Sequence, residues 1–427
     1  MNDLSTSKPS KLHNTWSSLP WGTILFLLAV FVFATPLFRF GFMSSTFGDT
    51  QEYLASGGFL NERILALILL GALALFNLLR SKPGRFQING LLGWLILFYL
   101  VWAALSIIWS IDARFTLKRV GILLLLSLGA LYVAERFSLR ETFALVFFIC
   151  AVSLLIGVVT VPLNPFELRS VLFWNSRFGG NMHPIAQGWN CGLLLLSAFA
   201  LYKTDEKKRA VYLTIAFITF LLLTLTQSRM PVLSFIMGSA VYWLLTSSKR
   251  YQGVLFFLLI VIFVCSVYFL LGHEFMDVSQ NTISLGREGG TLKSLTGRRP
   301  LWEKVMLLVH YRPFTGYGYD SVLVSQNLTW IKEQLSWATP SPHSGYIATL
   351  GGLGYIGAVT LVLILILSVK MSISLARRNP EYAFITAVLV WLISNMFTEE
   401  QILTRPYFVV FVWMILLARL GFIREKR

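Results

Sequence analysis

Long apolar stretches dominate the pattern of this chain, and short polar segments separate them. Many of these stretches are long enough to cross a hydrocarbon layer of about 30 Å. They lie near 21–40, 60–79, 89–109, 119–134, 141–161, 184–202, 210–226, 231–247, 251–272, 344–369, 382–397 and 404–422. The pattern predicts an all-α polytopic membrane protein with about twelve transmembrane helices, in which residues 1–427 form a single integral-membrane domain.

The largest polar interruption, 273–343, separates the ninth and tenth apolar stretches. Within it, Pro300 suits the start of a helix, and Leu301, Val305 and Leu308 recur on one face. We therefore expect a large periplasmic loop with a short amphipathic helix across the mouth of the bundle. An anchor in the lipid headgroups would show the same features.

Positive charge is concentrated in alternate short connections. The chain has 36 Lys and Arg against 20 Asp and Glu, a formal net charge of +16. Because cytoplasmic loops carry an excess of Lys and Arg, the basic connections predict that both termini are cytoplasmic. They also argue against a nucleic-acid partner. The basic connections are 80–85, 136–140, 203–209, 249–250, 370–378 and 424–427.

Composition excludes a large soluble fold, since 56% of the residues are hydrophobic and only 13% are charged. The three cysteines, Cys150, Cys191 and Cys265, lie inside apolar stretches, which argues against a disulfide framework. The first apolar stretch, 21–40, lacks a convincing cleavage site. We expect it to be a retained anchor rather than a signal peptide.

The segment Thr339-Pro-Ser-Pro-His343-Ser-Gly-Tyr346 contains the main candidate for catalysis. Two prolines restrict the backbone ahead of an apolar helix, and His343 stands at the predicted membrane surface. An imidazole titrates near neutral pH and can accept a proton from a hydroxyl nucleophile. A lone histidine can also be purely structural, and this alternative stays open here.

Arginines on the same predicted face are candidates for binding an anion. Arg229 lies at the amino-terminal end of a helix, where exposed N–H groups favour negative charge. Arg298 and Arg299 begin the predicted amphipathic helix, and a guanidinium can grip a phosphate through two parallel hydrogen bonds. Interfacial snorkelling is the alternative for these arginines.

Other residues of this face are weaker candidates. Arg177 and His183 flank a glycine-containing loop before a span, and a structural role is favoured for His183. Glu399 and Glu400 could orient a base or bind a sugar hydroxyl, but a solvated turn is the favoured interpretation. The pattern contains no Asp-rich pair, no His-x-x-x-His and no Cys cluster, so we expect neither a metal nor a cofactor.

Together these motifs resemble the O-antigen ligase/polymerase superfamily of bacterial membrane glycosyltransferases, called Wzy_C-like. The resemblance covers 225–360 as the catalytic region. Its motifs are Ser228-Arg229, Thr296-Gly-Arg298-Arg-Pro-Leu-Trp302, Arg312-Pro-Phe-Thr-Gly-Tyr-Gly318, His343-Ser-Gly-Tyr346 and Gly351-Gly-Leu-Gly-Tyr-Ile-Gly357. Tyr346 joins the site candidates as part of its motif. The family usually has Asn where this chain has Ser344.

The resemblance implies metal-independent, inverting transfer of a glycan from undecaprenyl diphosphate. Arg229 and Arg298 would hold the diphosphate, with Arg299 in reserve, and His343 would deprotonate the acceptor hydroxyl. It also implies that the protein lies in the bacterial inner membrane, contacts membrane lipids and has its active site on the periplasmic face. A chain-length regulator is left open as a partner.

Three functions are compatible with the sequence. The form His343-Ser-Gly favours a polymerase that joins lipid-linked repeat units into an O-antigen or exopolysaccharide. A ligase that moves the glycan to lipid A core, or to a protein acceptor, uses the same donor chemistry. A transporter or flippase is disfavoured, because the spans carry few ionisable residues and no repeat between halves is visible.

Overall fold

A computed structural model describes residues 21–34, 61–80, 86–160, 177–180, 182–247, 298–335, 339, 341–399 and 407–423. Helices make up most of these residues, and no strand occurs in these ranges beyond the isolated bridge between Phe86 and Ile423. The predicted all-α fold is therefore confirmed. The predicted span at 251–272, together with Cys265 and Glu400, lies outside the described residues.

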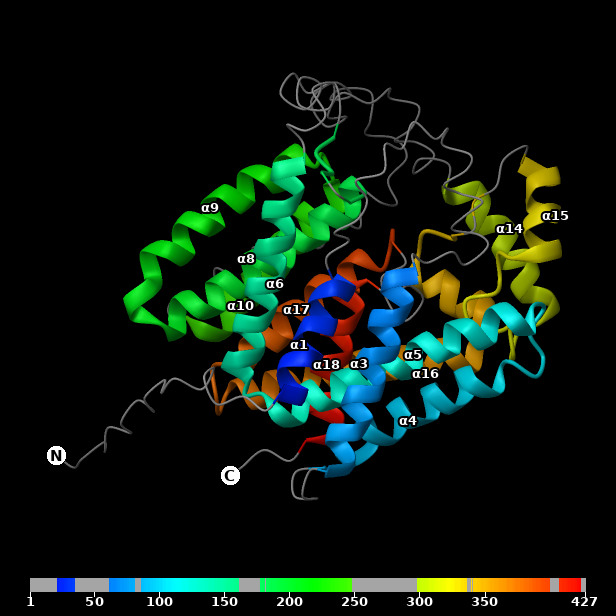
Figure 1. Ribbon diagram of the computed structural model, residues 1–427. Helices are drawn as coiled ribbons and strands as arrows, with labels where there is room; N and C mark the ends of the chain where they lie inside the picture. Colours follow the sequence, from blue (N-terminus) through cyan, green and yellow to red (C-terminus); the bar gives the residue numbers. More distant parts are fainter. Residues whose placement is uncertain are drawn as a thin grey trace.

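The predicted apolar stretches that fall within these ranges coincide with helices. Those helices are α1 (Trp21–Ala34), α3 (Asn61–Arg80), α4 (Gly90–Leu105), α5 (Ala113–Arg136), α6 (Leu139–Thr160), α8 (Pro184–Thr204), α9 (Arg209–Leu225), α10 (Arg229–Thr246), α16 (Gly345–Ala376), α17 (Tyr382–Asn395) and α18 (Phe408–Phe422). Two further helices, α14 (Arg298–Tyr311) and α15 (Ser325–Leu335), lie in the predicted large loop (Figure 1). A 3₁₀ turn, η2 (Glu206–Lys208), joins α8 to α9.

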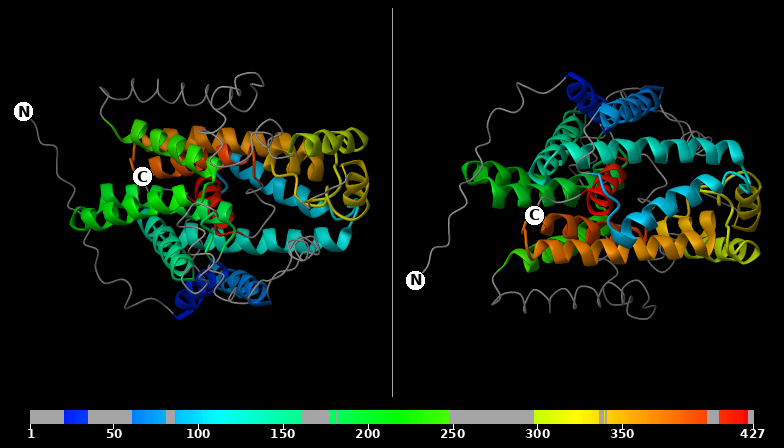
Figure 2. Two further views of the ribbon diagram at one scale, coloured as in Figure 1. Left: turned by 90° about the horizontal axis from the view of Figure 1, so that it is seen from above. Right: turned by 90° about the horizontal axis from the view of Figure 1, so that it is seen from below.

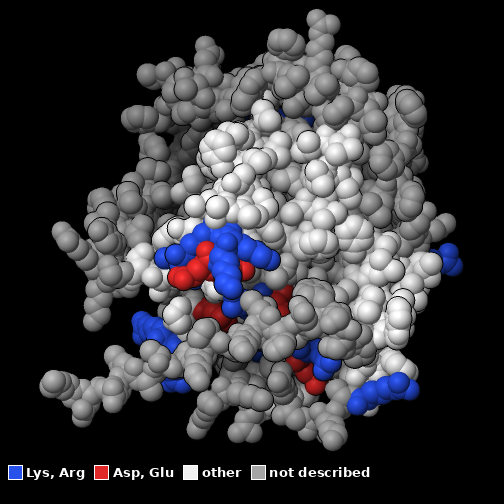
Figure 3. Space-filling view, turned by 60° about the vertical axis from the view of Figure 1, so that its left-hand side comes forward, with Lys and Arg blue, Asp and Glu red and all other residues white. Residues whose placement is uncertain are grey.

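Length and exposed surface identify a membrane protein. Six of the described helices are long and apolar enough to cross a bilayer. On α9, large apolar side chains such as Phe217, Ile218 and Leu221 are exposed. Figure 3 shows a broad surface without charged side chains, next to clusters of Lys and Arg. Apolar surface of this extent needs a non-aqueous environment, which a lipid bilayer provides.

The centre of the bundle is formed by α17 and α18 with part of α8. Almost every described residue of α17 and α18 is buried, including Trp391 and Trp413. Small residues permit this packing, because a Cβ at Gly238 of α10 would lie 2.9 Å from the Ala387 carbonyl oxygen of α17. Within a bilayer the hydrophobic effect does not drive helices together, so van der Waals contact at such close approach supplies much of the attraction between them.

One end of the bundle is defined by contacts between helix termini that are distant in sequence. Asn89, before α4, donates to the carbonyl of Leu420 at the end of α18, at 2.9 Å. Arg140, at the start of α6, donates to the carbonyl of Thr204 at the end of α8, at 2.6 Å. Exposed Lys and Arg of 203–209 and 377–378 belong to this end. We call it the basic end; its cytoplasmic location stays a prediction.

Helix α16 is broken near its start by a loop that pairs with its backbone. Gly354 has φ +66°, so the helix is kinked there. The amides of Tyr317 and Gly318 donate to the carbonyls of Gly351 and Gly352 at 3.0 and 2.9 Å. The glycines of these two motifs therefore permit close approach between the loop and the backbone of α16.

A Gly316→Ala substitution is expected to destabilise the protein by about 2–4 kcal/mol. Gly316 has φ +65°, and an added Cβ would lie 2.5 Å from backbone atoms of Gly352. Thermal unfolding in detergent measures the effect. Gly121→Ala in α5 is the matched control, because nothing lies within 4 Å of its Cβ position. Equal decreases in the unfolding temperature of the two variants would contradict a stabilising role for the pairing between this loop and the backbone of α16.

The same loop is also held by α5. Arg119 of α5 forms a largely buried ion pair with Asp320, with 3.1 Å between Nε and Oδ2. On the other side of the loop, α14 buries Leu301, Val305 and Leu308, the face predicted from the sequence. Helix α15 follows and was not predicted. Figure 2 shows α14 and α15 beside the α4–α5 turn and the start of α16, at one extremity of the molecule.

Candidate functional site

His343 lies immediately before α16 in an unusual backbone conformation. Its φ is +52°, in the left-handed region that side-chain-bearing residues rarely adopt. Its amide donates to the hydroxyl of Ser341 at 3.2 Å, and the side chain is half-buried. Left-handed backbone costs about 1–2 kcal/mol for such a residue, so the surrounding contacts must hold the segment in place.

The turn that follows α17 supplies those contacts. The amide of Gly345 donates to the carbonyls of Met396 and Glu399, at 2.9 and 3.1 Å. The hydroxyl of Ser344, at the position where the family usually has Asn, donates to the same Met396 carbonyl at 3.3 Å. Ser344 is buried and fixes the backbone beside His343.

Helix α14 holds the other side of the His343 segment. The indole Nε1 of Trp302 donates to the carbonyl of Pro342 at 2.7 Å. Trp302 lies one turn into α14, which begins with Arg298. The bond therefore fixes the position of His343 relative to the start of α14.

Arg298 forms an ion pair with Glu399. The Nη2 to Oε1 distance is 2.7 Å, and the two side chains are 17% and 10% exposed. The interpretation of Glu399 as a solvated turn is therefore wrong, because its carboxylate is buried against a guanidinium. Glu399 also accepts the amide of Gly345 through its carbonyl. Arg298, Glu399 and the backbone after His343 thus form one connected unit, which we call the His343 cluster.

Arg299 differs from its neighbour. Its side chain is 55% exposed, and its Nε lies 3.3 Å from the carboxylate of Glu303, one turn along α14. This exposed pair within one helix contributes little to stability. The reserve candidate therefore lies on the outer side of α14, while Arg298 lies on the side of the His343 cluster.

Arg229 belongs to a second group around the turn between α9 and α10. It lies at the amino-terminal end of α10, as predicted, and Pro231 falls in the first helical turn. Arg177 donates from Nε to the carbonyl of Thr226 at 2.9 Å and from Nη2 to the Ser228 hydroxyl at 2.6 Å. Arg177 therefore braces the turn that presents Arg229.

His183 and Tyr346 have structural contacts. The Nδ1 of His183 accepts the amide of Ile185 at 3.3 Å and caps α8 at its amino terminus. The Tyr346 hydroxyl donates to the carbonyl of Ile393 at 3.2 Å, and its ring packs 5.0 Å from that of Phe397. These bonds account for both side chains without a substrate.

The two groups lie at the same end of the bundle. Helices α10 and α17 pack together in opposite directions. Met237 in the middle of α10 lies near Ser394 at the end of α17, with 3.5 Å between the sulfur and the hydroxyl oxygen, and Tyr242 near the end of α10 lies close to Glu381 at the start of α17. The start of α10 and the end of α17 therefore face the same side, with Arg229 on one helix and the turn to Glu399 on the other. We call this the site end. It lies opposite the basic end.

Two tyrosines of the adjoining loop remain neutral. Burial raises the pKa of Tyr317, and the nearby Arg312 offsets only part of this effect. Burial also raises the pKa of Tyr319 well above its usual value. The Tyr317 hydroxyl donates to the Leu308 carbonyl at 3.1 Å. Both rings therefore act in packing rather than as proton acceptors.

Across the described ranges, no three His, Cys, Asp or Glu side chains gather in a way that could hold a metal ion. Basic and hydrogen-bonding groups predominate at the site end. A half-buried imidazole thus belongs to the same hydrogen-bonded cluster as a guanidinium that a carboxylate holds in position. Such a pairing can bind an anionic leaving group and take up a proton from an attacking hydroxyl.

Comparison with known families finds a match in the part of the chain that holds the main candidate residues. Residues 214–362 match the family model described as O-antigen ligase. The match includes Arg229, Arg298 and His343, and it confirms the predicted resemblance to the O-antigen ligase/polymerase superfamily for the part of the chain that it covers. No curated protein matches the chain.

Proposed function

We propose that this chain is a membrane glycosyltransferase that polymerises oligosaccharide repeat units linked to undecaprenyl diphosphate. The observation that carries the proposal is the His343 cluster. A buried Arg298–Glu399 pair and an imidazole on a constrained backbone meet at one end of an apolar bundle. A lipid-borne substrate with a charged head needs this combination of an apolar surface and cationic groups.

The proposed reaction is a single displacement at the anomeric carbon of the donor sugar. A hydroxyl of the acceptor attacks that carbon, and the bond from the carbon to the diphosphate oxygen breaks with inversion. His343 accepts the hydroxyl proton, and the lipid diphosphate leaves with the electron pair. Arg298 would stabilise the charge that develops on the leaving oxygen, usually a large contribution to catalysis.

Arg298 can serve this role while it is paired with Glu399. A guanidinium has five N–H donors, and the bond to Glu399 uses one nitrogen. The carboxylate restricts the side chain to one orientation, which reduces the entropy lost on binding. Arg229 would contact the same diphosphate from the start of α10, where the helix dipole adds to its charge.

A ligase is the second candidate, and one observation favours it. The matching family model is described as O-antigen ligase. The sequence His343-Ser-Gly345 is the feature that favours the polymerase instead. Both activities use the same donor and the same base. They differ in the acceptor, which is a growing glycan for one and lipid A core or a protein hydroxyl for the other.

A product ladder distinguishes the two activities. Purified protein is given a lipid-diphosphate-linked repeat unit, a metal chelator and no other acceptor, and the products are separated on a gel. A polymerase yields a ladder of repeat units despite the chelator. A ligase yields no ladder and forms a single ligated product only when lipid A core or a protein acceptor is added, and that result would overturn the proposed polymerisation.

The proposal extends to the placement of the reaction. We propose that 225–360 forms the catalytic region, that the site end faces the periplasm, and that the protein lies in the inner membrane of a bacterium. The donor's polyprenyl tail would remain in the bilayer while its diphosphate reaches the site end. A glycan acceptor would approach from the aqueous side.

A further inference from the structure

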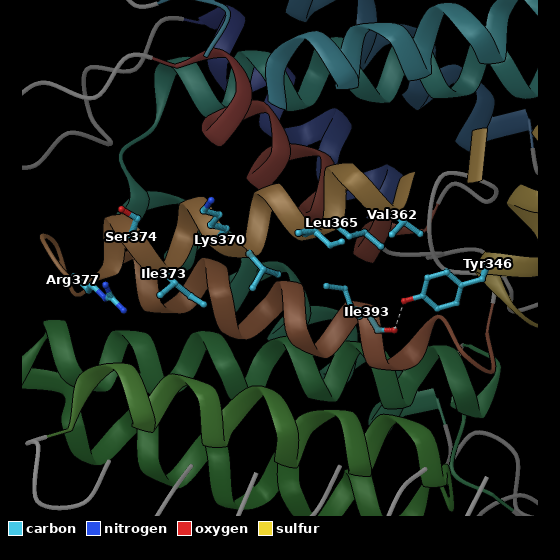
Figure 4. Close-up of a pocket in the computed structure, with 10 residues that line it drawn as sticks. Tyr346, Val362, Leu365, Lys370, Ile373, Ser374, Arg377 and Ile393 are labelled. Carbon is cyan, nitrogen blue, oxygen red and sulfur yellow. Dashed lines mark hydrogen bonds between the residues drawn. The ribbon is translucent and has the colours of Figure 1, made fainter. Parts of the chain in front are cut away.

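A groove of about 770 Å³ runs along the outside of α16, beside α17. Figure 4 shows Tyr346 at one extremity of the groove and Lys370, Ser374 and Arg377 near the other. Its walls are otherwise apolar. The lining residues are Tyr346, Val362, Leu365, Ile366, Val369, Lys370, Ile373, Ser374, Arg377 and Ile393.

Positive charge gathers at the extremity of the groove near the basic end. Lys370 and Arg377 lie seven residues apart, two helical turns, and therefore share one side of α16. Both side chains are exposed. Within the described ranges, no Asp or Glu forms an ion pair with either of them. Their charge is thus available to an anion at the membrane surface.

The apolar part of the groove is open to the side. Ile366 and Val362 are 57% and 43% exposed although they line the groove. Val362 and Lys370 are eight positions apart, which corresponds to about 12 Å of helix. A hydrocarbon chain can therefore lie along α16 within the bilayer while a head group reaches Lys370.

A second hollow of about 820 Å³ adjoins the same stretch of α16. It shares Lys370 and Ser374 with the groove and adds the polar side chains of Gln87, Asn89 and Arg419. Lys370 therefore stands between an apolar groove and a more polar hollow. A molecule with an anionic head and an apolar tail fits this arrangement.

We propose that this groove binds an anionic phospholipid, with its phosphate between Lys370 and Arg377 and an acyl chain along Val362, Ile366 and Val369. Basic hollows between transmembrane helices on the cytoplasmic side bind such head groups. The donor lipid fits less well, because its diphosphate belongs at the site end. The phosphate-binding residues of the groove lie at the opposite end.

Native mass spectrometry of the purified protein tests the proposal with phosphatidylglycerol and phosphatidylcholine as probes. The wild-type protein is expected to retain phosphatidylglycerol in preference to phosphatidylcholine. The double variant Lys370→Gln/Arg377→Gln should lose about tenfold or more of its affinity for phosphatidylglycerol. Arg378→Gln is the matched control, because Arg378 is exposed beside Arg377 but does not line the groove.

A second pair of variants tests the acyl-chain path without a change in charge. Ile366→Trp should fill the groove and reduce retention of phosphatidylglycerol. Leu363→Trp should not, because Leu363 is exposed on α16 outside the groove. No preference for the anionic lipid, or equal losses in test and control variants, would overturn the proposal. Displacement of phosphatidylglycerol by equimolar undecaprenyl phosphate would overturn it too, and would assign the groove to the donor tail.

Discussion

A His343→Asn variant is expected to lose glycosyl transfer by about 10²–10⁴-fold, the usual contribution of a general base. Asparagine is the informative replacement because His343 has φ +52°, and Asn tolerates left-handed backbone better than most residues. The variant should therefore fold and insert normally. Its amide cannot accept the hydroxyl proton. Transfer rates with a lipid-diphosphate-linked donor measure the loss.

His183→Asn is the matched control for this experiment. His183 is exposed and caps α8 through Nδ1, and Asn is a good capping residue. Transfer should change by less than about twofold, since the free energy of capping is preserved. If the transfer rate of His343→Asn equalled that of His183→Asn, His343 would not be the base.

An Arg298→Met variant should reduce transfer by about 10²–10³-fold, as loss of a donor to the developing negative charge typically does. It should also lower the free energy of unfolding by about 1–3 kcal/mol, because the largely buried Glu399 carboxylate would lose its ion pair with Arg298. This estimate allows for the residual exposure of the pair, 17% and 10%. Transfer rates and thermal unfolding in detergent measure the two effects.

The double variant Arg298→Met/Glu399→Leu separates catalysis from stability. Replacement of both partners by apolar groups removes the unpaired charge, so the stability lost in Arg298→Met should largely return. Transfer should remain low, because the diphosphate still lacks its guanidinium. Recovery of transfer along with stability would show that Arg298 acts only in folding.

Much of the fold could be predicted from the sequence because the bilayer imposes a simple rule. A backbone in lipid must satisfy its hydrogen bonds internally, so long apolar stretches such as 184–202 and 344–369 become helices. The amphipathic α14 was predicted from the spacing of Leu301, Val305 and Leu308. Arg229 was predicted to lie at the amino-terminal end of a helix, and α10 does begin there.

The contacts of the site could not be predicted in the same way. The Arg298–Glu399 pair joins residues that are 101 positions apart, and no local pattern reports such a contact. Glu399 stands in a short polar connection, which usually indicates a solvated turn. The left-handed backbone of His343 also depends on contacts from Trp302 and the 396–399 turn, which come from elements distant in the chain.

We propose above all that this protein transfers a glycan from a lipid diphosphate with His343 as base. Release of undecaprenyl diphosphate by the purified protein, in the presence of a chelator and a suitable acceptor, tests it most directly. We expect one lipid diphosphate released for each glycosidic bond formed, and almost none from His343→Asn. Movement of the intact lipid-linked glycan across a bilayer, without release of lipid diphosphate, would contradict the account and indicate a transporter.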